Sequence, residues 1–121
     1  MRRPDTKPRK DILESEIESY LEELCESRGW LCEKVATTGS AGFPDRCVIA
    51  DGRVVFVELK RPDHKPRKLQ VRTLERLVAH GAETCVVHDA DTADLFVEMM
   101  EEKSPITVAD HVTFYVTRRP S

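Results

Sequence analysis

The dipeptide Asp51-Gly52 separates two short apolar runs in the middle of the chain, residues 47–50 and 54–57. Both residues tolerate the positive φ angle that a type I′ turn requires, so the pattern is typical of a two-residue β-hairpin. Such a turn also fixes the register of the two strands, because a slip of one residue would move every side chain to the other face. The face on which each side chain lies therefore follows from the turn.

This register places the carboxylates of Asp45 and Glu58 directly opposite each other on a mostly apolar face. Opposed carboxylates repel each other and are costly to desolvate, an objection that a divalent cation between them would remove. Mg²⁺ takes one or two protein carboxylates and leaves positions for water and a substrate phosphate. Lys60 lies on the same face and would place a cation beside that phosphate. The geometry suggests metal-assisted attack of water on a phosphodiester.

Apolar periodicity predicts the elements around the hairpin. They are a helix over residues 12–28, a strand over 30–36, the hairpin, a helix over 68–80, a strand over 83–88 and a helix over 92–103. Asp11 is placed to cap the first helix, which Gly29 ends, and Gly81 ends the second. Both faces of the hairpin are apolar, which predicts central strands covered on both sides. This alternation suits an α/β sandwich in which the strand around Cys85 joins the sheet beside that of Glu58.

The hairpin residues also carry a resemblance to a known family. The motifs Pro44-Asp45 and Glu58-Leu59-Lys60 resemble the PD-(D/E)XK nuclease signature. Four further positions extend the match, namely Gly42, Phe43, Gln70 and Gly81. The fuller pattern, over about residues 12–90, resembles the VRR-NUC family in its stand-alone form from phages and prophages. It implies a restriction-endonuclease-like αβββαβ sandwich, an α/β fold whose central mixed sheet is flanked by helices.

The resemblance implies roles for the hairpin residues. Asp45, Glu58 and the Leu59 carbonyl would bind Mg²⁺, for which Mn²⁺ can substitute. Lys60 would orient the attacking water or stabilise the charge that develops on the phosphate. No organic cofactor is expected.

Two helices are expected to contribute to the site. Related nucleases often place a first-helix glutamate near the metal, three residues before an apolar position, and Glu14 before Ile17 fits this spacing. Glu18, on the same border of the apolar stripe, is the alternative, and a solvated surface position is a third interpretation for either glutamate. Gln70 would hydrogen-bond metal-site groups, as the resemblance implies, or is an ordinary polar residue at a helix start. Leu69 does not fit the apolar stripe of that helix.

The charges are unevenly distributed, although the formal net charge of the 121 residues is −3. Residues 58–72 hold six basic and two acidic residues, and residues 1–10 hold five basic and one acidic. A local basic face holds phosphates whatever the total charge. The residues expected to contact DNA are Arg61, Lys65, Arg67, Lys68, Arg72 and Gly42. Gly42 ends a loop of small residues that lets DNA backbone come close or is an ordinary connection.

The chain is expected to form one nuclease domain over residues 11–103, after a flexible basic arm, residues 1–10, that is solvated or touches DNA. Residues 104–121 form an extension that serves as an edge strand or a dimer contact. No apolar run approaches the roughly 20 residues of a membrane span. The sequence therefore predicts a cytoplasmic protein without a membrane partner, encoded by a phage or prophage in a bacterial host.

These features predict a metal-dependent, structure-selective DNA endonuclease. The resemblance implies branched DNA, such as junctions or flaps, as substrate, and a homodimer as the assembly. The alternative is a non-catalytic DNA-binding module with a nuclease-like fold, which the presence of Asp45, Glu58 and Lys60 disfavours. A purely structural domain would leave the opposed carboxylates unexplained.

Overall fold

A computed structural model describes residues 3–39 and 41–106 of the chain. Its helices are α1 (Glu14–Glu26), α2 (Lys68–Ala79) and α3 (Ala90–Glu101), and its strands are β1 (Leu31–Lys34), β2 (Arg46–Ala50), β3 (Arg53–Leu59) and β4 (Glu83–Val87). Two 3-10 helices, η1 (Pro4–Thr6) and η2 (Arg9–Asp11), precede α1. This order confirms the expected αβββαβ core, to which α3 is added. The predicted edge strand or dimer contact lies, from residue 107 onward, outside the described residues.

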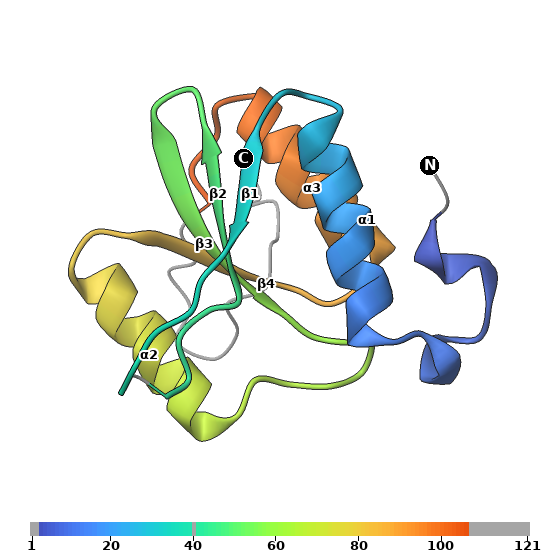
Figure 1. Ribbon diagram of the computed structural model, residues 1–121, viewed down its shortest axis with the longest axis horizontal. Coiled ribbons are helices and arrows are strands. Elements are labelled where there is room, and N and C mark those ends of the chain that lie inside the picture. Colours follow the sequence, from blue (N-terminus) through green and yellow to red (C-terminus); the bar gives the residue numbers. More distant parts are fainter. Residues whose placement is uncertain (1–2, 40, 107–121) are drawn as a thin grey trace.

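The hairpin forms with the predicted register. Asp51 and Gly52 have positive φ angles of 48° and 81°, and Ala50 pairs with Arg53. The strand order is β1-β2-β3-β4, in which β1, β2 and β3 are antiparallel neighbours and β4 runs parallel to β3. This mixed sheet has α1 and α3 on one face and α2 on the other (Figure 1). The architecture is therefore the expected α/β sandwich.

The main core lies between the sheet and the pair α1 and α3. Its fully buried members include Leu21, Val48, Val55, Val57 and Phe96. On the opposite face, α2 packs Leu74 against Val86 of β4. Near the hairpin turn, Ile49 and Val54 of that face are 36% and 45% exposed. The expectation of cover on both sides is therefore wrong near the turn, because α2 packs over β4 instead.

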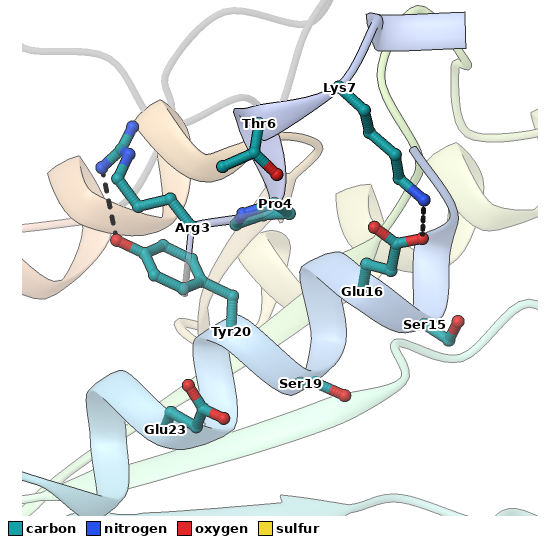
Figure 2. A pocket seen from close by; sticks show the side chains of 9 residues that line it. All are labelled: Arg3, Pro4, Thr6, Lys7, Ser15, Glu16, Ser19, Tyr20 and Glu23. Atoms are coloured by element: carbon teal, nitrogen blue, oxygen red, sulfur yellow. Dashed lines mark hydrogen bonds and ion pairs between the residues drawn. The ribbon is translucent and has the colours of Figure 1, made fainter. Parts of the chain in front are cut away.

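The segment before α1 packs against the domain instead of projecting as an arm. Pro4 is buried, and the Arg3 guanidinium pairs with Asp91 and Asp94 of α3. The same guanidinium donates a hydrogen bond to the hydroxyl of Tyr20 on α1 (Figure 2). The expectation of a flexible arm is therefore wrong from residue 3 onward, because acidic side chains of the domain supply counter-ions for its basic residues.

A cavity of about 420 Å³ lies between this N-terminal segment and α1 (Figure 2). Lys7 reaches across from the segment to Glu16 of α1, at 2.7 Å. The α1 residues that line the cavity are Ser15, Glu16, Ser19, Tyr20 and Glu23. At about 100° per residue these side chains point away from that of Glu14. The cavity is therefore separate from the hairpin carboxylates.

None of the described helices is long and apolar enough to cross a membrane.

Candidate active site

Asp45 and Glu58 lie together at the end of the hairpin opposite its turn. Asp45 directly precedes β2, where its backbone carbonyl accepts a hydrogen bond from the Val35 amide at 2.9 Å. Its Oδ2 accepts a hydrogen bond from the Leu59 amide, also at 2.9 Å. Glu58, next to last in β3, is 1% exposed. The hairpin register, together with this backbone contact across it, holds the Asp45 carboxylate beside that of Glu58.

The Glu58 carboxylate is buried without a compensating partner. No N–H donor of the described residues bonds to either of its oxygens, and the polar group beside it is the Asp45 carboxylate, with which only a protonated Glu58 can share a hydrogen bond. The pKa of Glu58 is raised to about 9. Burial is the main cause, and the neighbouring Asp45 carboxylate is a further cause. An ionised carboxylate in such a place is costly unless a cation is paired with it. This end of the hairpin is therefore suited to a bound positive charge.

The donor atoms here fit a hard divalent cation. Mg²⁺ needs only one or two protein carboxylates, and Asp45 and Glu58 supply two. Within the described ranges, no three acidic, histidine or cysteine side chains are already gathered closely enough to hold an ion. Further ligands would be the Leu59 carbonyl, water, or Glu14 after a side-chain movement.

Glu14 and Lys60 lie near the two hairpin carboxylates. Glu14 is the first residue of α1. Its pKa is raised, mainly by partial burial and next by the negative charge of Asp45, whereas the positive charge of Lys60 lowers it. The same two charges, Lys60 and Glu14, also act on the pKa of Glu58. The Lys60 amide donates to the Val87 carbonyl at 3.0 Å, which fixes its backbone beside β4. Glu14 and Lys60 are therefore near enough to Asp45 and Glu58 for their charges to affect the pKa values of Glu14 and Glu58, although the described acidic side chains are not gathered into a ready metal site.

Arg46 is a residue of this region that the sequence analysis missed. It is 8% exposed and donates from Nε to Glu18 Oε2 at 2.8 Å, from Nη1 to the Cys32 carbonyl at 2.9 Å and from Nη2 to Glu22. Glu18, the alternative helix carboxylate, is thereby engaged, whereas Glu14 has no hydrogen bond or ion pair with any described residue. The available signal was a lone arginine beginning an apolar strand, together with glutamates spaced four apart.

Gln70 forms a hydrogen bond through its side chain, whereas Leu59 forms one through its backbone. Gln70, in the first turn of α2, is 7% exposed, and its Oε1 accepts a hydrogen bond from the Arg67 amide at 2.8 Å. This hydrogen bond is the one expected of a polar residue at a helix start, and the interpretation of Gln70 as a partner of metal-site groups stays a prediction. The Leu59 side chain is buried in the core, so only its backbone contacts Asp45.

The five basic residues from Arg61 to Arg72 form two groups. Four of them are exposed and make no ion pair with the described part of the chain; we call Lys65, Arg67, Lys68 and Arg72 the basic surface. A hollow of about 250 Å³ lies between Lys68 and Arg72. Arg61 instead donates to the Lys10 carbonyl at 2.6 Å, close to where Arg9 pairs with Asp63 at 3.3 Å. Arg61 is thus engaged by the N-terminal segment.

Gly42 has a role within the fold. Its φ angle is +81°, and a Cβ atom there would lie 3.1 Å from backbone and side-chain atoms of Leu69. The glycine therefore lets the loop before β2 pack against the start of α2. This contact also explains Leu69, which lies outside the apolar stripe of α2 and is 46% exposed.

The fold and the acidic end of its hairpin define an α/β protein of the nuclease type. A solved structure described as a VRR_NUC domain superposes with a TM-score of 0.65 at 32% identity, over 73% of this chain and 94% of that one. The putative nuclease p44 of Acyrthosiphon pisum secondary endosymbiont phage 1 is 34% identical over 85 residues, which are 69% of this chain and 91% of that protein. No family model matches. At this similarity and coverage, the chain belongs to the VRR-NUC family.

Proposed function

We propose that this chain is a metal-dependent DNA endonuclease that hydrolyses phosphodiester bonds. The observation that carries the proposal is the buried Glu58 carboxylate, which lies beside Asp45 and accepts no hydrogen bond from an N–H donor of the described residues. Two such carboxyl groups cannot both be charged without a large cost unless a cation neutralises them. Membership of the VRR-NUC family and the similarity to a phage protein described as a putative nuclease support the same function.

Each residue of the site would have a separate task. Asp45, Glu58 and the Leu59 carbonyl would hold Mg²⁺ or Mn²⁺, with Glu14 as a further ligand, directly or through water. The ion, when bound, supplies Lewis acidity toward the phosphate and lowers the pKa of a water. The Leu59 amide holds the Asp45 carboxylate in place through Oδ2, and the carboxylate would contribute an oxygen to the ion. The Lys60 ammonium would orient the attacking water or stabilise the charge developing on the phosphate.

The basic surface would hold the DNA backbone beside this site. Contacts to phosphates give affinity without reading sequence, which suits an enzyme that selects the shape of its substrate. We include branched DNA, a junction or a flap, in the proposal, because the VRR-NUC resemblance implies it. We also include a homodimer, because one domain carries one candidate site and two copies would reach two strands.

Cleavage of a labelled DNA panel tests this proposal. The panel holds a four-way junction, a flap, a duplex and a single strand, each with Mg²⁺ or Mn²⁺. Wild type is compared with Asp45→Asn, Lys60→Met and the control Lys103→Met, which removes a lysine just after α3. Wild type and the control should cut, the branched DNAs most rapidly, and the two site variants should not. Binding by wild type without cutting under either metal would overturn the enzyme and leave the DNA-binding module.

A further inference from the structure

We propose that Arg46 is a positioning residue, which sets α1 so that Glu14, and neither Glu18 nor Glu22, serves the metal. This role rests on the proposed metal site. Arg46 directly follows Asp45, and side chains alternate along a strand, so the two point to opposite faces of the sheet. Asp45 lies on the same face of the sheet as Glu58, whereas Arg46 lies on the other face, where it bonds to glutamates of α1.

The glutamates of α1 form a row. Glu14, Glu18 and Glu22 are spaced four residues apart, so they lie one above another along the same side of the helix. Like charges at this spacing repel each other and destabilise a helix. The Arg46 guanidinium bonds to Glu18 and Glu22, which neutralises the second and third members of the row. Glu14 is left as the member without a cation partner among the described residues.

The same guanidinium also connects three elements of the fold. Its third hydrogen bond goes to the Cys32 carbonyl, so that α1, β1 and β2 share one buried donor group. The middle of α1 is thereby fixed relative to the start of β2, next to Asp45. Because Glu14 is about one helical turn before Glu18, a shift of α1 would move its carboxylate away from the hairpin pair. Arg46 would therefore affect metal affinity without touching the metal.

Metal affinity measured by calorimetry, with Mn²⁺ alone as the probe, tests this role. Arg46→Met should weaken binding, by at most the roughly 10- to 100-fold that follows loss of a group bonded directly to a metal ligand. Arg53→Met is the matched control, because Arg53 begins the next strand and is likewise paired, with Glu83 and the Ser104 carbonyl. It should lower stability but leave Mn²⁺ affinity unchanged. Wild-type affinity in folded Arg46→Met would overturn the role.

A double-variant cycle separates positioning from a general loss of stability. Glu14→Gln alone should weaken Mn²⁺ binding, and adding Arg46→Met should then cause little further loss, because Arg46 acts through Glu14. Fully additive losses would overturn the proposal. Arg46→Lys, which keeps a charge but loses the three-way contact, should give an intermediate affinity and serves if Arg46→Met does not fold. Failure of wild type itself to bind Mn²⁺ would instead reject the metal site.

Discussion

At the scale of single residues, Glu58 is an acid whose charged form the fold disfavours, and the cost depends on pH. Its pKa is raised from 4.5 to about 9. Below the lower value the group is protonated in both the folded and the unfolded chain, and it has no effect on stability. Between the two values the unfolded chain releases the proton while the folded chain retains it. The free energy of unfolding of the metal-free protein therefore falls as pH rises through this window.

We expect this fall to amount to several kcal/mol between about pH 5 and pH 9, since each unit of pKa difference corresponds to about 1.4 kcal/mol. In Glu58→Gln the contribution of this site should vanish, and the profile should be flatter. In Asp45→Asn the fall should shrink but persist, because burial is the larger cause of the shift. Urea unfolding in the presence of a chelator measures all three profiles. Parallel profiles for wild type and Glu58→Gln would contradict the burial of an unpaired carboxylate.

Gly42 provides a second prediction at this scale, with Gly39 as its control. Both have positive φ, +81° and +79°, but a Cβ at Gly39 would meet no atom within 4 Å. Gly39→Ala should cost about 1–2 kcal/mol, for backbone conformation alone. Gly42→Ala should cost about 1–3 kcal/mol more, because Leu69 must also move. Chemical denaturation measures the free energy of unfolding of both variants. Equal losses of stability would show that Leu69 moves away from the added Cβ atom without a cost in free energy.

Residues of the candidate site differ in how far the sequence could predict them. Asp45, Glu58 and Lys60 follow from one turn, because Asp51-Gly52 fixes which residues oppose each other across the hairpin. Arg46 does not follow, since its partners lie on α1 and β1, and no local spacing shows which strand a helix packs against. Pairings of that kind depend on the tertiary fold.

At the scale of elements, the N-terminal segment differs most from its expectation. A basic, proline-containing stretch predicts a solvated arm, yet Arg3 finds acidic partners on α3, about ninety positions away in the sequence. Element ends also shift. Asp11 belongs to η2 and does not cap α1, which begins after Leu13, and the Leu13 side chain is 49% exposed instead of joining the apolar stripe.

The packing of this segment predicts the effect of removing Arg3. We expect Arg3→Met to speed amide hydrogen exchange in residues 4–11, because the ion pairs with Asp91 and Asp94 are lost. The Arg3 side chain is 38% exposed, so the free energy of unfolding should change by only about 1 kcal/mol. Lys10→Met is the control, because the exposed Lys10 side chain makes no ion pair with the described residues. Unchanged exchange in Arg3→Met would show that these pairs do not hold the segment.

At the scale of the whole molecule, the fold separates its stable part from its reactive part. The core between the sheet and the helices α1 and α3 is apolar, whereas the carboxylates and the basic surface lie where β3 leads into α2. The N-terminal segment adds to this separation, since Arg3, Lys7 and Arg9 are paired with acids of the same chain. Of the 19 lysines and arginines of the chain, six are paired with acids among the described residues, whereas the four of the basic surface are not.

This distribution predicts how DNA affinity depends on salt. With a net charge of −3, attraction to DNA requires a local basic face, and four phosphate contacts from the basic surface should give a slope of log affinity against log salt near about −3 to −4. Each of Lys68→Ala and Arg72→Ala should reduce that slope by about one. Lys103→Ala, past the end of α3, should leave it unchanged. Binding isotherms between about 50 and 200 mM salt, with Asp45→Asn and a chelator to prevent cleavage, measure these slopes. Unchanged slopes in both basic-surface variants would place the DNA on another face of the molecule.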